Sequence, residues 1–283
     1  MFRLGCAVWA HKGWVGRLFP ETAQPRDYLR LYGEKLACVE GNTTFYATPG
    51  PETVEGWAES VPPEFQFCPK LPRAITHEGP IAPHTAPAWE FAELMGLLGE
   101  RLGPIFAQLP PSYSPRRLSD LTTFLDAWPH GRYPLALEVR NPEWFEAPYS
   151  RRLHRLLASL NVGKVLLDTR PIYEGPESPE LAEERKKPEL PLLPVVTAHF
   201  AFVRYIGHPE LERNERYLEE WAARVESWLD QEIEVYFFCH CPNEDMSVDI
   251  ARRLHALLLE RGASVPSIDW EVEAVDRSQL ALF

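Results

Sequence analysis

Apolar residues follow two patterns that alternate along the chain. Short runs rich in Val, Ile, Leu and Phe recur eight times with few polar interruptions, which is typical of strands covered on both faces by helices. These runs cover residues 4–9, 38–45, 65–71, 104–109, 135–140, 164–169, 200–206 and 235–240. Between them, apolar residues repeat at helical spacing over 91–102, 118–128, 153–160 and 221–229, and further helices are expected from about residue 51 and over 247–261.

The alternation of strands and helices predicts an α/β protein with a parallel sheet. At this chain length we expect the eight strands to close into a single (β/α)8 TIM barrel, and a doubly wound open sheet is the alternative. Residues 171–194 break the pattern, because prolines bracket a charged run over 180–187. We therefore expect an irregular or degraded sixth helix there, or a long loop. No linker is visible, so we predict one domain over 1–283 with a packed C-terminal extension over 263–283.

Charge and cysteine content narrow the classes of function. The 283 residues carry a formal net charge of −12, which argues against sequence-independent binding of nucleic acid over the whole surface, because such binding needs many basic side chains facing phosphates. Five single cysteines argue against a disulfide framework and favour a reducing compartment. The first apolar run is too short for a signal peptide, and no segment reaches the roughly 18 to 20 apolar residues of a membrane span. We expect a cytoplasmic protein without a membrane partner.

Proline content suggests adaptation to heat. The chain has 28 prolines, more Arg than Lys and few of the thermolabile amides Asn and Gln. Loops rich in proline and a low amide content are typical of thermophilic proteins. A GC-rich genome would produce the same bias toward Arg and Pro.

Polar side chains stand where the apolar runs end. In a TIM barrel, the carboxyl ends of the strands and the loops after them form the functional face. A buried charge costs several kcal/mol unless it is paired, so ionisable groups there need partners or a ligand. A structural ion-pair network is one explanation, but a whole set around one mouth favours a binding or active site. The set comprises Glu40, Asn42, Tyr46, Lys70, His77, Gln108, Glu138, Arg140, Asp168, Arg204 and His240.

Residue types divide this set by role. Carboxylate, imidazole and amine groups transfer protons, so the expected catalytic residues are Glu40, Lys70, Glu138, Asp168 and His240. Cationic and other polar groups hold a carboxylate or phosphate, so the expected substrate-binding residues are Asn42, Tyr46, His77, Gln108, Arg140 and Arg204. Glu138 and Arg140 share one strand face at period two, so one is expected to orient the other or balance its charge.

The run Cys239-His240-Cys241 raises the question of a metal site. On a regular strand, the two cysteines face one way and the histidine faces the other, so the three cannot ligate one ion. We therefore predict no metal-binding residues and treat the cysteines as core residues; a divalent metal that enters with substrate has no supporting motif. The chain also lacks GxGxxG, P-loop, HExxH and GxSxG motifs, so no cofactor is predicted.

Several long segments resemble a known family. They are GCAVWAHKGWVGRLFP, VEGNTTFYATPGPETVEGWAESVPPEFQFCPKLPRAITH, FAQLPPSY, LEVRNPEW and FVRYIG. In this order, they resemble the YecE-like family of proteins of unknown function over nearly the whole chain. The resemblance implies a TIM barrel and functional positions at Glu40, Asn42, Tyr46, Lys70, His77, Gln108, Glu138, Arg140, Asp168 and Arg204. The chain departs from the family pattern at Gly41, where Ile is common, and at 239–241, where many members have FNN.

The mixture of acids, bases and cations predicts an enzyme of hydrolase or isomerase type that acts on a polar anionic, for example phosphorylated, substrate. The alternative is a non-catalytic protein that binds a phosphorylated ligand or a polynucleotide. For that alternative, a basic mouth with stacking surfaces would come from Lys12, Arg17, Lys70, Arg73, Arg140, Arg170, Arg204, Trp9, Trp14, Tyr46 and Trp144. A third interpretation is a protein whose rim charges only pair with each other.

Overall fold

The computed structural model describes residues 1–174, 181 and 187–272. In this part of the chain, eight parallel strands alternate with helices, which confirms the predicted TIM-barrel fold. The strands are β1 (Phe2–Cys6), β2 (Cys38–Gly41), β3 (Gln66–Pro69), β4 (Ile105–Gln108), β5 (Leu135–Glu138), β6 (Gly163–Asp168), β7 (Phe200–Ile206) and β8 (Glu234–His240).

The strands form one nearly closed barrel. Their order is β3-β2-β1-β8-β7-β6-β5-β4, so β1 pairs with β8 as it does in a barrel and not in the doubly wound alternative. Between β3 and β4, two isolated parallel bridges replace a continuous ladder and join Phe67 to Leu102 and Lys70 to Phe106. The seam between β3 and β4 therefore lacks a continuous ladder, and Lys70 lies on it.

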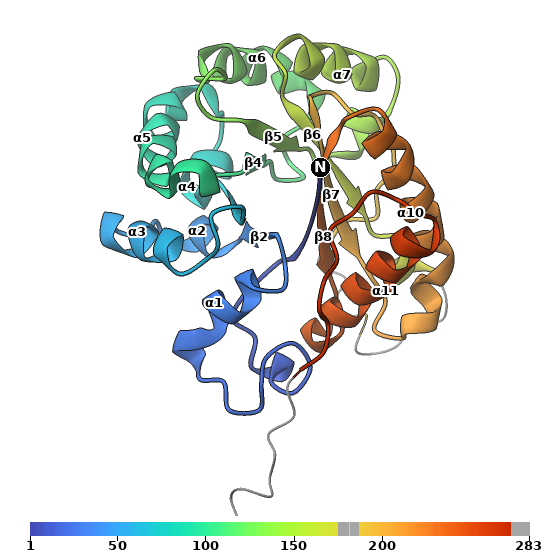
Figure 1. Ribbon diagram of the computed structural model, residues 1–283. Coiled ribbons are helices and arrows are strands. Elements are labelled where there is room, and N and C mark those ends of the chain that lie inside the picture. The colour runs from blue at the N-terminus through green and yellow to red at the C-terminus, as the bar shows by residue number, and fades with distance from the viewer. Residues whose placement is uncertain (175–180, 182–186, 273–283) are drawn as a thin grey trace, which may run out of the picture.

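Helices lie around the outside of the strands, with α10 and α11 packed against each other beside β8 (Figure 1). The α-helices are α1 (Tyr28–Gly33), α2 (Thr43–Tyr46), α3 (Pro51–Glu59), α4 (Arg73–Thr76), α5 (Thr85–Met95), α6 (Leu118–Ala127), α7 (Tyr149–Ser159), α8 (Arg170–Tyr173), α10 (Glu215–Asp230) and α11 (Ser247–Glu260). Short 3-10 helices are η1 (Lys12–Trp14), η2 (Pro25–Asp27), η3 (Ala82–His84), η4 (Gly96–Arg101), η5 (Pro115–Arg117), η6 (Pro142–Phe145), η7 (Leu211–Asn214) and η8 (Glu244–Met246).

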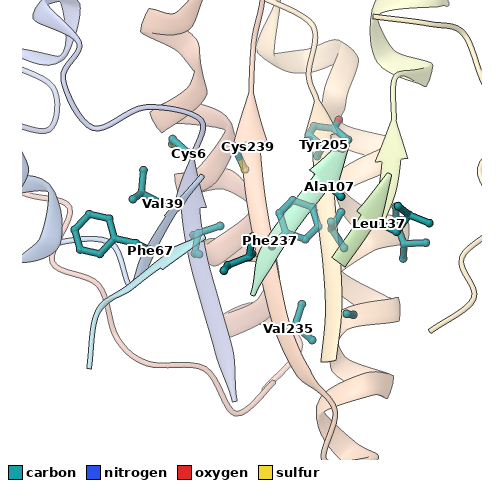
Figure 2. Close-up of a cluster of buried hydrophobic side chains, with 14 of the residues drawn as sticks. Cys6, Val39, Phe67, Ala107, Leu137, Tyr205, Val235, Phe237 and Cys239 are labelled. Atoms are coloured by element: carbon teal, nitrogen blue, oxygen red, sulfur yellow. The ribbon is translucent and has the colours of Figure 1, made fainter. Parts of the chain in front are cut away.

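Successive residues of each strand point to opposite faces of the barrel wall. One face packs against the helices in a large core, in which Figure 2 shows Val39, Ala107, Leu137, Tyr205 and Cys239 from five strands. The other face fills the barrel interior with a second apolar cluster: Cys38, Cys68, Phe106, Ala136, Val165, Phe200, Phe202, Tyr236 and Phe238. Toward the carboxyl ends of the strands, the residues that follow these apolar residues at a spacing of two are polar. They are Glu40, Lys70, Gln108, Glu138, Arg204 and His240.

The second strand is shorter than predicted. The sequence predicts extended structure over 38–45, but β2 ends at Gly41 and α2 begins at Thr43. The Thr44 hydroxyl lies 2.8 Å from the carbonyl oxygen of Gly41 and accepts the Lys70 amide at 3.1 Å. This contact with the end of β3 favours a helical turn over further extension, and it leaves Tyr46 82% exposed.

The helix predicted over 91–102 also ends early. Helix α5 stops at Met95, and the chain continues as the 3-10 helix η4. Gly99 has a φ of +60°, a left-handed conformation that glycine adopts without strain. The apolar spacing nevertheless persists, because Leu98 remains buried.

The region after β6 is irregular, as predicted. The short helix α8 follows β6, and residues 187–199 contain neither helix nor strand. Most of the predicted charged run lies outside the described residues. The same holds for residues 273–283 of the predicted C-terminal extension, while Trp270 packs back on α11 by donating from Nε1 to His255 Nδ1 at 3.1 Å. Within the described ranges, no helix is both long and apolar enough to cross a membrane.

Candidate functional site

A cavity of about 520 Å³ opens at the carboxyl ends of the strands. We call it the mouth cavity. Its lining comes from strands and loops that are far apart in sequence, and it is formed by Ala7, Asn42, Phe45, Tyr46, Lys70, Arg73, His77, Gln108, Arg140, Lys187, Arg204, His240 and Glu244. Five of these side chains are basic, so the cavity is a concentration of positive charge within an acidic protein.

Arg204 is the central residue of the site. Its side chain is 2% exposed and lies above the Phe106 ring, with 5.5 Å between its guanidinium carbon and the ring centre. Nε and Nη2 donate to the two carboxylate oxygens of Glu40 at 2.7 and 2.6 Å, and Nη1 donates to Glu138 Oε2 at 2.5 Å. A bidentate pair of this kind fixes the plane of the guanidinium. Arg204 therefore links β7 to β2 and to β5 across the barrel interior.

The carboxylates of Glu40 and Glu138 accept further hydrogen bonds. Arg140 Nε donates to Glu138 Oε1 at 2.5 Å, as expected from their shared strand face. Asn42 Nδ2 donates to Glu40 Oε1 at 2.6 Å, and His240 Nε2 lies 3.0 Å from Glu40 Oε2. All four carboxylate oxygens of the pair are thus occupied by protein groups.

The two carboxylates are held in their ionised form. Burial alone would raise the pKa of Glu40, but the charge of Arg204 and the hydrogen bonds from His240 and Arg204 hold that pKa well below its usual range. Burial also acts to raise the pKa of Glu138, and the charges of Arg140, Arg204 and Lys70 overcome it and lower the pKa to about 2. Carboxylates with such low pKa values are poor proton acceptors at neutral pH.

Lys70 is in a different electrostatic position from the other cations. It is 6% exposed, its amine donates to the neutral Gln108 Oε1 at 2.8 Å, and it lies 4.0 Å from the centre of the Phe45 ring. Burial, followed by the nearby charge of Arg204, lowers the pKa of Lys70 to about 7. The Phe45 ring face favours the ammonium form by only about 0.5–2 kcal/mol, so much of this side chain is a neutral amine at neutral pH.

His240 and Lys187 form a chain of hydrogen bonds beside Glu40. Burial lowers the pKa of His240 to about 3 despite its contact with Glu40, so its ring is neutral. Nε2 then carries the proton that Glu40 accepts, and Nδ1 accepts from Lys187 Nζ at 3.2 Å. Burial and the charge of Arg204 lower the pKa of Lys187 to about 8.

The outer part of the mouth cavity is formed by His77, Tyr46 and Arg73. His77 Nδ1 lies 2.8 Å from the Thr76 hydroxyl, and burial together with the charge of Lys70 lowers the pKa of His77 to about 4. Its ring meets the edge of Phe45 with 5.0 Å between centroids. The Arg73 side chain is exposed and makes no hydrogen bond to any residue in the ranges that the structure describes.

Most residues of the predicted site come together here. The mouth cavity is lined by Asn42, Tyr46, Lys70, His77, Gln108, Arg140, Arg204 and His240, and Glu40 and Glu138 lie directly beneath it, bonded to Arg204. Sequence reasoning missed Lys187 and Glu244 as lining residues. Lys187 stands in a proline-bracketed charged run and Glu244 in a loop, and neither position follows from strand periodicity.

Asp168 does not join the site. Its carboxylate accepts from Arg170 Nε and Nη2 at 3.0 and 2.9 Å and from Trp221 Nε1 at 2.7 Å. Trp221 belongs to α10, so Asp168 points toward the helical layer and not into the barrel. The reason is strand phase, because Val165 faces the interior and Asp168, three residues later, faces the other way. The expected catalytic role of Asp168 is therefore withdrawn.

The aromatic residues proposed for stacking are mostly unavailable. Trp14 and Trp144 are buried, and their ring nitrogens donate to the carbonyl oxygens of Glu244 and Tyr113. Trp9 packs against Trp57 with 5.4 Å between ring centroids. Of the four proposed stacking residues, only Tyr46 lines the mouth cavity.

The five cysteines are all buried, and none of them forms a disulfide within the described residues. Cys239 and Cys241 belong to the core between strands and helices, whereas His240 faces the mouth cavity, as alternation predicts. Among the residues that the structure describes, no three His, Cys, Asp or Glu side chains are grouped so that they could hold a metal ion.

Sequence comparison places the chain in a family. A family model described as "Protein of unknown function DUF72" matches residues 3–273. The chain is 33% identical over 271 residues to the UPF0759 protein YecE of Escherichia coli (strain K12), which covers 95% of each chain. It is 26% identical over 157 residues to the UPF0759 protein YunF of Bacillus subtilis (strain 168), which covers 53% of this chain and 54% of that one.

Solved structures share the fold. A DUF72 family protein from Enterococcus faecalis v583 superposes with a TM-score of 0.71 at 17% identity, covering 98% of this chain and all of that one. A DUF72 family protein from Thermotoga maritima MSB8 superposes with a TM-score of 0.67 at 22% identity, covering 92% of this chain and 99% of that one. At these identities the likeness concerns the fold alone. The match of the family model and the YecE relationship show that the chain belongs to the DUF72 family.

Proposed function

We propose that this protein is an enzyme that binds a small polar anion, such as a phosphorylated or carboxylated compound, in the mouth cavity. One observation carries the proposal: the cavity is lined by Lys70, Arg73, Arg140, Lys187 and Arg204, with Glu244 the only lining carboxylate among the described residues. Clefts lined by one sign of charge attract ligands of the other sign.

Two arginines are the best candidates to hold the anion. Arg140 uses only Nε for a hydrogen bond within the described part of the chain, so its two terminal nitrogens remain available to a ligand. The exposed Arg73 lines the same cavity. Guanidinium groups bind carboxylate and phosphate oxygens with two parallel hydrogen bonds. Arg204, in contrast, is committed to Glu40 and Glu138, and its role is to position those carboxylates.

Lys70 is the proposed reactive group. A buried amine with a pKa of about 7 serves at neutral pH as a base or as a nucleophile. Glu40 and Glu138 act as positioning residues, since their oxygens are occupied and their pKa values are low. The neutral His240, bonded to Glu40 and Lys187, is placed for proton transfer at the inner wall. This combination fits the hydrolase or isomerase type.

The alternative is a protein that binds phosphorylated ligands or polynucleotides without catalysis. The basic cavity suits any phosphate, but Trp14 and Trp144 are buried, which removes two of the surfaces on which bases would stack. Arg17 and Arg170 are also engaged, with Asp249 and Asp168. These contacts favour a small ligand over a strand of nucleic acid.

Calorimetric titration with inorganic phosphate, sulfate, sugar phosphates and short oligonucleotides tests the binding step. We expect binding of a small anion that Arg140→Met weakens by about tenfold or more, because one charge-assisted hydrogen bond contributes about 1.5–3 kcal/mol. Arg132→Met is the matched control, since Arg132 is exposed and pairs with Glu93 away from the cavity. Oligonucleotide binding with a steep salt dependence would instead support the polynucleotide alternative.

Turnover is tested separately. Compounds that bind are incubated with wild type and with Lys70→Met, and products are followed by NMR. Conversion by wild type and loss of conversion in Lys70→Met are expected. Binding without conversion of any bound compound would contradict the enzymatic proposal and leave a binding protein.

A further inference from the structure

Lys70 presents an amine without a carboxylate partner. Glu40 and Glu138, the acids nearest to the site, are saturated by Arg204, Arg140, Asn42 and His240, and no ion pair to Lys70 exists within the described residues. The hydrogen bond to Gln108 Oε1 fixes the direction of the amine without adding a negative charge. An amine in such surroundings keeps a free electron pair more readily than one that is paired with an acid.

The other buried lysines are placed differently. Lys164 lies on the outward phase of β6, its Nζ donates to the carbonyl oxygen of Leu193, and burial lowers its pKa to about 8. Lys187 lines the mouth cavity, but its amine is bonded to His240. Of Lys70, Lys164 and Lys187, Lys70 is thus the one that combines access to the cavity with the lowest pKa. Lys164 is a buried lysine without that access.

Anion-binding groups surround the amine. Arg140 and Arg73 line the same cavity as Lys70, and the apolar faces of Phe45 and Phe106 lie 4.0 and 5.8 Å from Nζ. A compound held by its charged end would present its uncharged end to the amine, beside rings that exclude water. Desolvation and a neighbouring cation are the two ways in which proteins activate a lysine for attack on a carbonyl group.

We propose that Lys70 forms an imine with an aldehyde or ketone that also carries a carboxylate or phosphate group. This inference rests on the proposed function and narrows its substrate class to carbonyl compounds. The neutral nitrogen attacks the carbonyl carbon, a proton moves from nitrogen to the carbonyl oxygen, and the carbinolamine then loses water as the carbon–oxygen bond breaks. A proton from solvent at the open mouth then protonates the imine nitrogen. The sum is that amine, carbonyl compound and one proton give iminium and water.

The iminium would direct the chemistry of the site. Its positive nitrogen withdraws electrons from the iminium carbon and makes a proton on the carbon next to the iminium carbon easier to remove. Such activation serves an isomerase, in which a proton leaves one carbon and returns to another. It gives no advantage to hydrolysis of an ester, so the inference separates the two proposed reaction types.

Reductive trapping tests the inference. The protein is incubated at pH 7.5 with pyruvate, glyoxylate, dihydroxyacetone phosphate or glyceraldehyde 3-phosphate, and sodium borohydride is added. A trapped imine raises the protein mass by that of the probe less one oxygen atom, and peptide mapping locates it. With a pKa of about 7, roughly three quarters of Lys70 is neutral at this pH, against about one in a thousand for an ordinary lysine. We expect Lys70 to be modified at least about tenfold more than any exposed lysine.

Two variants and one analogue make the result decisive. Lys70→Met should lose the adduct and Lys164→Met should keep it, while mapping on the wild type answers the question even where a variant folds poorly. Modification spread over surface lysines, or none with any of the four probes, would overturn the imine. Glycerol 3-phosphate lacks the carbonyl group, so it reports anion binding alone. If it binds and none of the four probes forms an adduct, the imine proposal is contradicted and the anion site is retained. If it does not bind and no adduct forms, both proposals are contradicted.

Discussion

Replacing Lys70 by methionine should change how stability depends on pH. Methionine has a similar length and no charge, so it removes the titrating group and leaves Gln108 without its donor. In the folded wild type, burial and Arg204 lower the pKa of Lys70 to about 7 from 10.5. The groups that face the amine are Arg204, Glu138, Glu40 and Arg140.

The sign follows from proton linkage. Between pH 7 and 10.5 the unfolded chain holds a proton on Lys70 that the folded protein has released, so the free energy of unfolding rises with pH across this window. Below pH 7 both states are protonated and the folded state bears the full cost of a buried ammonium. The difference of about 3.5 pH units corresponds to about 5 kcal/mol. Between pH 6 and pH 9, loss of the proton from folded Lys70 raises the free energy of unfolding by about 2.7 kcal/mol.

Urea denaturation of wild type and Lys70→Met at pH 6, 7, 8 and 9 measures the effect. The free energy of unfolding of wild type, relative to the variant, should rise by about 2.7 kcal/mol over this range. The comparison variant Lys164→Met should show a rise of about half that size, because the pKa of Lys164 is about 8. A difference between wild type and Lys70→Met that stays constant from pH 6 to pH 9 would show instead that Lys70 remains an ammonium in the folded protein.

Three further predictions concern the charges around Lys70. Arg204→Met leaves Glu40 and Glu138 buried without their shared cation, and urea denaturation should show a loss of about 3–5 kcal/mol; an unchanged midpoint would contradict the central role of Arg204. The pKa of Glu138, lowered to about 2, adds stability that is present above pH 4.5 and is lost as pH falls toward 2, so Glu138→Gln should unfold with a shallower dependence on acid pH than wild type; equal slopes would contradict this. Asp168→Asn weakens the contacts with Arg170 and should lower the thermal midpoint without changing phosphate affinity; a weakened affinity would return Asp168 to the site.

Strand periodicity explains how much of the site could be predicted. Runs of apolar residues predict eight strands, and polar residues at their ends predict Glu40, Glu138, Arg204 and His240 as site residues. The order of the strands in the sheet follows from the structure, in which β1 pairs with β8. A position at the end of a strand does not by itself show whether the side chain faces the barrel interior. Asp168 ends its strand as Glu138 does, but it lies in the outward phase, and only a comparison with Val165 and Leu167 separates the two cases.

Local contacts account for the residues that periodicity could not place. The apolar pattern predicts an extended strand up to Phe45 with Tyr46 just beyond it, but the hydrogen bond between Thr44 and the amide of Lys70 joins residues 26 positions apart, and the chain turns into α2 there. Lys187 reaches His240 from a segment with no regular structure. Such contacts depend on how distant segments meet in the folded barrel, which residue spacing does not encode.

The network beneath the mouth cavity has a structural interpretation as well as a functional one. Buried ion pairs often stabilise a protein no better than apolar residues of the same shape, so the arrangement of Glu40, Glu138 and Arg204 is weak support for stability as its purpose. Burial lowers the pKa of Lys70 most, and Arg204 lowers it further, whereas Glu138 and Glu40 act to raise it. The ion pairs of these two carboxylates are nevertheless made with Arg204. The pH measurements on Lys70→Met detect the lowered pKa of Lys70.

Binding of an oxyanion in the mouth cavity underlies the roles proposed for Arg140, Arg73 and Lys70. Crystals of the protein grown with sodium tungstate, a tetrahedral oxyanion with strong anomalous scattering, locate bound anions directly. We expect an anomalous peak inside the mouth cavity, within hydrogen-bond distance of Arg140 and Arg73 and beside Lys70, and loss of this peak in Arg140→Met. Peaks confined to the outer surface, with the mouth cavity free of tungsten, would contradict it.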